Sequence, residues 1–534
     1  MRFLTKLPVL AALSISLLAG SAPAVIAQAQ STGGRVVLVL PFENRSGNTS
    51  LNWIGDSFPD TLNKRLNSAG FLTISHDDRV YALQHLGLPA DFRPSRATTI
   101  RIAQQLDANY VIIGNFTTNN DKLAIQARVL SVDELHLTPP VEDSAELTRL
   151  FDAENAIAWK VARAIDPHFN VAEATFLAAP GAVPLSAFED YIRGIDAPSQ
   201  DERIQRLKAA IAINPNYPAA LLALGKEQYA ARDFAAAAAT LAKVPADDRV
   251  ALEASFYLGL SRFNSADYAG AENAFGFVAT RLPLSEVLNN QAVALSRQGK
   301  DAVAFFQRVT SSDPNDEDYH YNLAVSLFRR GDTVEALHEA DAALKLKPND
   351  NEAGSLRAHL SLVPLGTRLT DPVVGNFSPQ ERIRRTYSET GFRQAAFQLN
   401  QMRAAQLAVL PAAQQAAQYN QLASENLAQG LMLEAEGHFQ SALAADPRNA
   451  VAHAGLARVR EASGDRTNAR NEAMASLQLQ PNVAALLVLA RLDLAENSLS
   501  AAANDVSRAL TIEPTNSAAL ALRQNLQQRG QQVP

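Results

Sequence analysis

Residue types that could support catalysis or metal binding are sparse in this sequence of 534 residues. The nine histidines are scattered singly, with no His-Glu-x-x-His and no pair at helical spacing, and there is no cysteine. The usual zinc patterns are therefore missing. The sequence also lacks a phosphate-binding loop, a dinucleotide fingerprint and a Gly-x-Ser-x-Gly nucleophile motif. We predict no catalytic residue, no metal site and no cofactor, and we expect the protein not to be an enzyme.

Pairs of adjacent carboxylates are the remaining candidates for acid-base chemistry: Asp77-Asp78, Asp133-Glu134 and Asp247-Asp248. Two carboxylates can act as general acid and general base. Each pair lies in a polar, turn-like stretch, which favours a solvated loop. The loop from Asn44 to Asn48 is also open to two interpretations, since an exposed loop on a rigid strand is a usual place for recognition. A plain strand-helix connection is the preferred one.

A basic cluster, Arg382, Arg384 and Arg385 beside Tyr387, could hold an anionic segment of a partner. The residues just before it, 378–381, combine an N-cap serine, a first-turn proline and a capping-box glutamate. They predict the start of a helix. The preferred interpretation of the arginines is therefore a solvated helix face.

The first 27 residues have the pattern of a cleavable signal peptide, with Arg2 and Lys6 before a short apolar run and a small-residue cleavage site ending at Ala27. The run holds about a dozen residues, whereas a membrane-spanning helix needs about 20. Removal of this leader takes two positive charges from a chain of formal net charge -7, so the exported protein is acidic and lacks the electrostatic footprint of nucleic-acid binding. Without cysteine there is no site for an N-terminal lipid. We expect a periplasmic or secreted protein that is not a lipoprotein and has no transmembrane segment after cleavage.

Strand and helix patterns alternate after the leader. Val36 to Leu40 is a continuous apolar run typical of a buried strand, and the apolar residues 54, 58, 62 and 66 recur at helical spacing. Further strand-like stretches cover 71–74 and 110–116, and alternating residues from 123 to 129 predict the hairpin partner of the latter. A last helix is expected over about 144–164. These patterns predict a small α/β domain over 28–175.

Two segments of this region carry a family resemblance: the Leu40-Pro41-Phe42-Glu43-Asn44 stretch with its following Ser-Gly, and the run from Leu106 to Phe116. Together they resemble the TolB-like (FlgO-like) N-terminal domain of bacterial envelope proteins, over about residues 35–167. The resemblance implies a compact α/β fold that binds partners and has no known active site.

Prolines recur at helical-repeat spacing in the rest of the chain. Pro314 and Pro348 are 34 residues apart, and Pro447, Pro481 and Pro514 follow at intervals of 34 and 33. A period near 34 indicates paired helices. Small residues lie twelve positions before these prolines, where they let two helices approach closely: Ala336, Ala435, Ala469 and Ala502.

The clearest unit places Gly259, Ala271 and Phe275 before Pro283, and it resembles the tetratricopeptide repeat (TPR). Eight such units are expected, although the tryptophan usual in the first helix is absent. We predict a linker over 176–187, about five repeats over 188–363, an irregular helical insertion over 364–416, three repeats over 417–515, and a capping helix and tail over 516–534. The fold class is α+β overall, with the α/β domain followed by an all-α solenoid.

The resemblance implies that the first helices of the repeats line a concave groove that takes a peptide or protein. Carried over to this sequence, its inward-facing positions give these candidate contact residues: Phe256, Phe263, Asn289, Arg297, Tyr321, Phe328 and Arg329. Packing between helices is the alternative role for the phenylalanines. The expected function is an exported adaptor for a protein or peptide partner in cell-envelope assembly. The alternative is a small-ligand or enzymatic role of the α/β domain.

Overall fold

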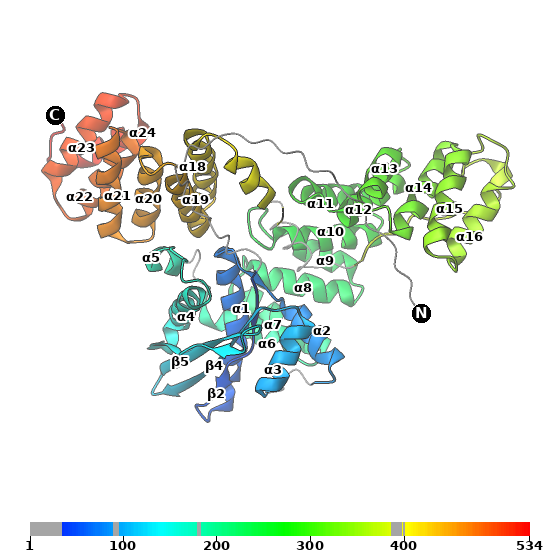
Figure 1. The fold of residues 1–534 in the computed structure, drawn as a ribbon, viewed down its shortest axis with the longest axis horizontal. Helices are drawn as coiled ribbons and strands as arrows, with labels where there is room; N and C mark the ends of the chain where they lie inside the picture. Colours follow the sequence, from blue (N-terminus) through cyan, green and yellow to red (C-terminus); the bar gives the residue numbers. More distant parts are fainter. Residues whose placement is uncertain (1–34, 89–94, 179–182, 386–397, 399–400) are drawn as a thin grey trace, which may run out of the picture.

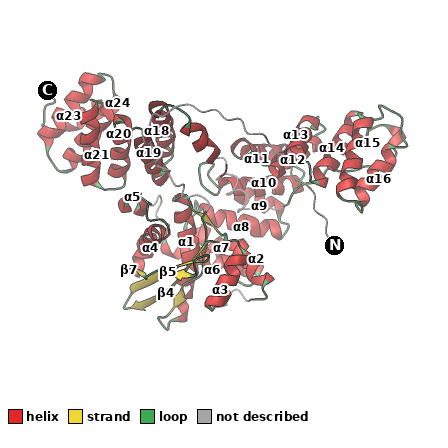
Figure 2. Cartoon of the chain, viewed as in Figure 1, coloured by secondary structure: helices red, strands yellow, loops and turns green. Residues whose placement is uncertain are grey.

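The computed structural model describes residues 35–88, 95–178, 183–385, 398 and 401–534. The expected leader and Tyr387 lie outside these residues. An α/β domain is followed by helical hairpins that form two arms, one on each side of it (Figure 1). Helices dominate, and every strand among the described residues belongs to the α/β domain (Figure 2). The expected α+β fold class is confirmed.

The sheet has the order β3-β1-β4-β5-β6, with β2 added beside β4 and β7 beside β5. Its centre is parallel, because β1 (Val36–Val39) pairs in parallel with β3 (Leu72–Thr73) and β4 (Tyr110–Asn119). The other half is antiparallel, since β4 turns back into β5 (Lys122–Ser131). The remaining strands are β2 (Glu43–Asn44), β6 (His136–Leu137) and β7 (Val141–Glu146).

Helices cover both faces of the sheet. On one face α1 (Asn52–Ser68) and α4 (Leu150–Ile165) pack on Val37 and Ile112. On the other face α2 (His76–His85) and α3 (Arg96–Gln105) pack on Leu38 and other buried strand residues. The alternation of buried residues along each strand thus separates two small cores. The last helix begins at Leu150 and not at 144, because residues 141–146 form the edge strand β7.

Eight helical hairpins follow the α/β domain within the described residues. The first arm contains α6 (Leu185–Ile195) with α7 (Gln200–Ile213), α8 (Pro218–Ala230) with α9 (Phe234–Leu241), α10 (Ala251–Asn264) with α11 (Tyr268–Arg281), α12 (Ser285–Arg297) with α13 (Val303–Ser312), α14 (Glu317–Arg330) with α15 (Thr333–Leu346), and the single helix α16 (Asn351–Leu360). The second arm contains α18 (Ala412–Ala428) with α19 (Met432–Ala445), α20 (Ala450–Ala462) with α21 (Arg466–Leu479), α22 (Val483–Ala495) with α23 (Leu499–Ile512), and α24 (Ser517–Gln528). Seven of the eight second helices end two residues before their proline.

Small residues allow the helices of a hairpin to approach. A Cβ atom on Gly259 would lie 2.7 Å from the Phe275 ring. Ala336, Ala435 and the other expected small positions are fully buried. Large buried side chains then fill the space between hairpins. This is the packing that the proline and small-residue spacing predicts.

The α/β domain joins both arms. Its main core continues into α6, where Phe188 lies 6.3 Å from Trp53 between ring centroids. A short helix, α5 (Glu173–Leu177), contacts α19 and α20 of the second arm. There the backbone N–H of Ala172 donates to the buried Glu436 carboxylate at 3.1 Å.

The helix expected from Ser378 is absent. A short 3-10 turn, η3 (Pro372–Val374), follows the first arm, and residues 377–385 then form neither helix nor strand. We call residues 376–385 the return segment. The backbone polar groups of Arg382 and Arg384 are satisfied by side chains of α12 and α14, and this tertiary contact outweighs the local helix signal.

Candidate functional site

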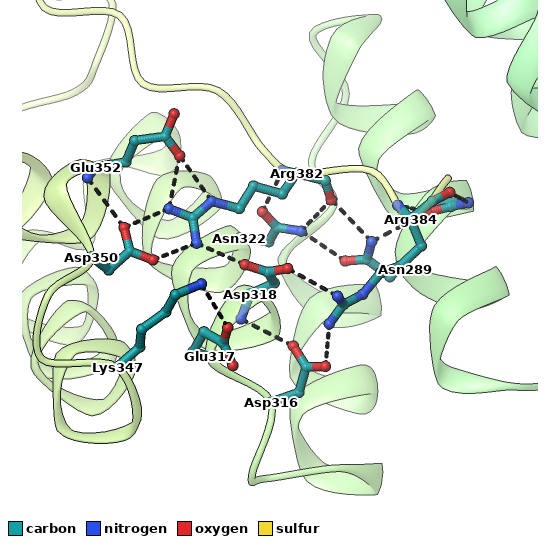
Figure 3. Close-up of polar contacts among 11 residues, drawn as sticks. Asn289, Asp316, Glu317, Asp318, Asn322, Lys347, Asp350, Glu352, Arg382 and Arg384 are labelled. Atoms are coloured by element: carbon teal, nitrogen blue, oxygen red, sulfur yellow. Dashed lines mark hydrogen bonds and ion pairs between the residues drawn. The ribbon is translucent and has the colours of Figure 1, made fainter. Parts of the chain in front are cut away.

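The return segment lies on the surface formed by the first helices α12 and α14. We call this the first-helix surface; it is defined by the residues of α12, of α14 and of the α14 N-cap that contact the return segment: Asn289, Asn290, Ser296, Arg297, Asp316, Asp318, Tyr319, Tyr321, Asn322 and Arg329. Figure 3 shows how the side chains of two arginines of the segment reach acidic residues of the first arm. The surface on which we expected a foreign peptide therefore carries a piece of the same chain.

Asparagine side chains hold the backbone of the segment. Asn322 accepts from the Arg382 N–H at 2.6 Å and donates to the Arg382 carbonyl at 2.8 Å. Asn290 makes the same pair of bonds with Arg384, both at 2.8 Å. Asn289 adds a bond to the Arg382 carbonyl at 3.1 Å. All three asparagines are fully buried. They contact alternate residues, which is how an extended chain presents one edge of its backbone.

The Glu381 carboxylate is fully buried and is held by three side chains. The Ser296 hydroxyl donates to Oε1 at 2.5 Å. The Arg329 Nε lies 2.9 Å from the same oxygen, and the Arg297 Nε lies 3.6 Å from Oε2. A buried carboxylate needs such partners, because an unpaired charge in a low-dielectric site is costly. This pocket fits an acidic side chain.

The Arg382 guanidinium lies among acidic groups at the N-terminal ends of two helices. It is 2.7 Å from each of Asp318, Asp350 and Glu352, and its Cζ lies 4.0 Å from the centre of the Tyr321 ring. The hydrogen bonds from Arg382 lower the pKa of Asp350 to about 2. Burial opposes the charge on Arg382, but its bonds to these carboxylates outweigh that effect and raise its pKa. This site fits a bidentate cation.

Arg384 occupies a second cationic position beside the first. It forms ion pairs with Asp316 and with Asp318, the latter at 3.0 Å, and its Cζ lies 5.2 Å from the centre of the Tyr319 ring. Between the two arginines, Ile383 packs against the hydrophobic clusters of the first arm. Asp316 also caps α14, where its side chain accepts from the Asp318 N–H. The Asp316 carboxylate is thus held in place by helix capping as well as by its ion pair with Arg384.

The structure places the expected groove residues in two different environments. Asn289, Arg297, Tyr321 and Arg329 contact the return segment. The three phenylalanines instead pack within the first arm: Phe256 and Phe328 are fully buried, and Phe263 is half-buried.

Sequence reasoning missed several contact residues and misplaced the arginines. The missed residues are Asn290, Asn322, Asp316, Asp318, Asp350 and Glu352. The pair Asp316 and Asp350 follows Pro314 and Pro348 at the same offset, a signal that was present in the sequence. The expected solvated helix face for Arg382 and Arg384 is wrong, because both arginines lie on an extended segment and are paired with carboxylates.

Residues 294–360 match the tetratricopeptide repeat family model. The helical array contains tetratricopeptide repeats. The structure of YrrB, described as a TPR protein with an unusual peptide-binding site, is 15% identical and covers 33% of this chain and 92% of its own, with a TM-score of 0.30.

A second similarity involves a different kind of protein. The penicillin-binding protein activator LpoB of Enterobacter sp. (strain 638) is 36% identical over 107 residues, which cover 20% of this chain and 49% of the relative. The chain thus spans about half the length of the curated relative it matches. The LpoB C-terminal domain from Escherichia coli is 25% identical and covers 22% of this chain and 84% of its own, with a TM-score of 0.20.

The helices and the polar side chains of the described residues bear on two other kinds of site. No helix there is long and apolar enough to cross a membrane. Among the same residues no group of three or more His, Asp or Glu side chains is arranged to hold a metal ion.

Proposed function

We propose that this protein is an adaptor of the cell envelope. Its first-helix surface binds an extended segment of a protein partner. The observation that carries the proposal is the return segment itself, which is held on that surface by backbone hydrogen bonds at Arg382 and Arg384. An array of tetratricopeptide repeats that holds an extended peptide suits the role of an adaptor. The proposal assigns no catalytic residue.

The proposed location is the periplasm or the cell exterior. It is supported by the signal-peptide pattern of the first 27 residues and by the similarity to a penicillin-binding protein activator. By the same similarity, we propose that a penicillin-binding protein or a related envelope enzyme is the partner of the α/β domain. The two arms would then hold a second protein close to that enzyme.

The test is crosslinking in living cells with the full-length, tagged protein, followed by mass spectrometry. We expect a discrete envelope protein to be captured, and we expect its yield to fall when Asn289 and Asn322 are both replaced by alanine. An unchanged set of captured proteins for this variant would contradict a role of the first-helix surface. Capture of no protein under several crosslinking conditions would contradict the adaptor function as a whole.

A cavity in the α/β domain favours a second candidate function, binding of a small anionic ligand. It has a volume of about 720 Å³ and lies beyond the carboxyl end of β1, where open α/β sheets commonly bind ligands. Its lining includes four arginines: Arg45, Arg79, Arg96 and Arg128. Burial lowers the pKa of Arg79 and raises that of Asp56, also in the lining, to about 6.

This second candidate predicts a melting-temperature rise of the full-length protein with succinate or inorganic phosphate. The rise should be absent in the Arg128→Ala variant and should persist in Arg149→Ala, which removes an exposed arginine on the same domain. Equal shifts in all three proteins would indicate a general salt effect.

A further inference from the structure

The first-helix surface makes two kinds of contact with the return segment, and they have different consequences. The asparagine bonds go to the backbone, so they fit any extended chain. The pockets around Glu381, Arg382 and Arg384 contact the side chains of these residues, so they select a particular sequence. A partner that satisfies both must be extended and must carry an acid, a base, an apolar residue and a base in that order.

We infer that the first-helix surface recognises a partner segment of the pattern Glu-Arg-apolar-Arg, and that residues 381–384 hold its place in the free protein as an internal competitor. The inference rests on the proposed function, since it names the partner chemistry and the regulation of the same site. It concerns a segment of another protein; exchange of the return segment between two copies of this chain is an outcome that the test distinguishes.

The polar character of the contact argues for recognition over mere bracing. Three fully buried asparagines direct their amides at the segment, whereas the apolar contribution of residues 381–384 is limited to Ile383. A connection that only joined two arms could be fixed by apolar packing alone. The amides of Asn322 and Asn290 each pair with both backbone groups of one residue, Arg382 and Arg384 in turn, so the surface is complementary to an extended backbone.

The charges of the surface define the pattern further. Swapping the acid and the first base would bring an acidic side chain against Asp318 and Asp350, and a base against Arg297 and Arg329. Like charges brought together in this way suppress wrong partners. The surface therefore discriminates the order of charges in the segment and not only their number.

The internal segment can be displaced. The Arg384 side chain is 32% exposed and that of its partner Asp316 is 20% exposed, so solvent screens this ion pair in part and reduces what it contributes. The segment gains instead from being tethered, which gives it an effective concentration on the order of mM. A partner segment with the same contacts therefore competes against this concentration, and weakening the internal copy should make the surface available.

The experiment measures binding of a fluorescent peptide with the sequence of residues 376–385 to the full-length protein, by anisotropy. We expect weak binding to the wild type and at least tenfold tighter binding to the variant Arg382→Ala/Arg384→Ala. A peptide with its glutamate and first arginine exchanged should not bind either protein. A matched control, Arg470→Ala/Arg491→Ala, removes two paired arginines of the second arm and should bind the peptide as weakly as the wild type.

Hydrogen exchange on the wild-type protein gives a second measurement that does not depend on a variant. Saturating peptide should speed exchange of the Arg382 and Arg384 amides, because these lose their bonds to Asn322 and Asn290. Amides of the second arm should not change.

Each result decides the inference. No gain in binding for a folded Arg382→Ala/Arg384→Ala variant, with no change in exchange, would show that the return segment is a permanent brace. A wild-type dimer that the peptide dissociates would assign the site to a second copy and overturn a foreign partner. Peptide binding without any captured envelope protein would keep the inference and reject the adaptor function. A captured partner that excess peptide does not release would keep the adaptor function and reject the inference.

Discussion

Asn322 lies under the return segment and uses both ends of its side-chain amide. Its oxygen accepts from the Arg382 N–H, and its nitrogen donates to the Arg382 carbonyl and to Asn289 Oδ1 at 2.8 Å. The side chain therefore links α14, α12 and the return segment. No hydroxyl could replace it, because a hydroxyl has one donor hydrogen for these two acceptors.

The replacement Asn322→Ala should loosen the segment without unfolding the arm. It removes the partner of the Arg382 N–H and leaves the Arg382 carbonyl with the Asn289 amide alone, at a cost of about 1–3 kcal/mol. We expect faster hydrogen exchange at Arg382 and faster tryptic cleavage after it, with an unchanged helical circular dichroism spectrum.

The matched control is Asn420→Ala, which removes another buried asparagine with a side-chain partner, Asn449, in the second arm. It should leave cleavage after Arg382 at the wild-type rate. Equal acceleration in both variants would mean that the effect is a general loss of stability.

The residues of the surface could be predicted in part, but their occupant could not. Asn289, Arg297 and Arg329 follow from their position relative to the small residue of each first helix, which is a local pattern. Arg382 contacts Asn289 across 93 positions of sequence. An extended segment has no periodicity that would indicate such a pairing, and its local sequence even favours a helix.

At the scale of elements, the helical hairpins are the part of the fold that sequence spacing describes best. Proline, small residues and large buried residues each act at fixed offsets in the repeat, so their positions report the packing directly. The strand β7 was missed for the opposite reason. Its sequence, Val-Glu-Asp-Ser-Ala-Glu, is mostly polar, and it pairs at the edge of the sheet, where backbone bonds to β5 suffice.

Close packing within a hairpin can be tested at Gly259. In Gly259→Ala the new methyl group would lie 2.7 Å from the Phe275 ring, so the ring or one of the two helices must shift. We expect a loss of about 1–3 kcal/mol in the free energy of unfolding. The change is measured by chemical denaturation.

Gly437 supplies the control for this change. It is also inside a helix, α19, but a Cβ atom there would have no neighbour within 4 Å. Gly437→Ala should stabilise the protein by about 0.5–1 kcal/mol, because alanine restricts the unfolded chain more than glycine does. A loss at both positions would contradict the packing explanation.

The contact between α1 and α4 should depend on pH through Glu154. This carboxyl group is fully buried and accepts from Ser57 and from Thr61, the latter at 2.6 Å. Burial raises its pKa to about 7, despite these hydrogen bonds, from a usual 4.5. The folded state therefore keeps a proton that the unfolded state releases between pH 4.5 and 7.

Because the folded state binds the additional proton, the free energy of unfolding should fall as pH rises through this window and level off above pH 7. The variant Glu154→Gln should lose this dependence and should exceed the wild type in stability at pH 8 by about 1–3 kcal/mol. The exposed replacement Glu146→Gln serves as control and should follow the wild-type curve. A rise in wild-type stability over the same range would contradict the assignment.

At the scale of the whole molecule, polar contacts fix both arms to the α/β domain. Lys226 of the first arm pairs with Asp77 at 2.7 Å, and Tyr191 donates to Asp60 at 3.0 Å. The second arm is held at α5, and Arg249 of the first arm reaches Glu434 of the second at 2.6 Å. The arms flank the α/β domain on opposite sides (Figure 1). Two proteins bound to the domain and to the first arm would thus be held at a defined separation.

Two carboxylates, Glu434 and Glu436, connect the second arm to the rest of the molecule. Glu434 pairs with Arg249, and the buried Glu436 accepts from the Ala172 N–H while it pairs with Arg460 at 3.2 Å. The variant Glu434→Ala/Glu436→Ala should release the arm, since the remaining polar bonds to the 170–175 region are long, at 3.3 and 3.4 Å. Small-angle scattering should then report a larger radius of gyration than that of the wild type.

The control for this release breaks an ion pair within the second arm. Glu461 and Arg491 lie 2.5 Å apart on α20 and α22, so Glu461→Ala perturbs the arm but not its attachment. Its scattering curve should match the wild type. If the double variant also matches, apolar contacts such as that of Leu433 with the core of the α/β domain are sufficient to hold the arm. In that case the shared hydrophobic core keeps the second arm attached to the α/β domain, and the polar contacts set only the orientation of the arm.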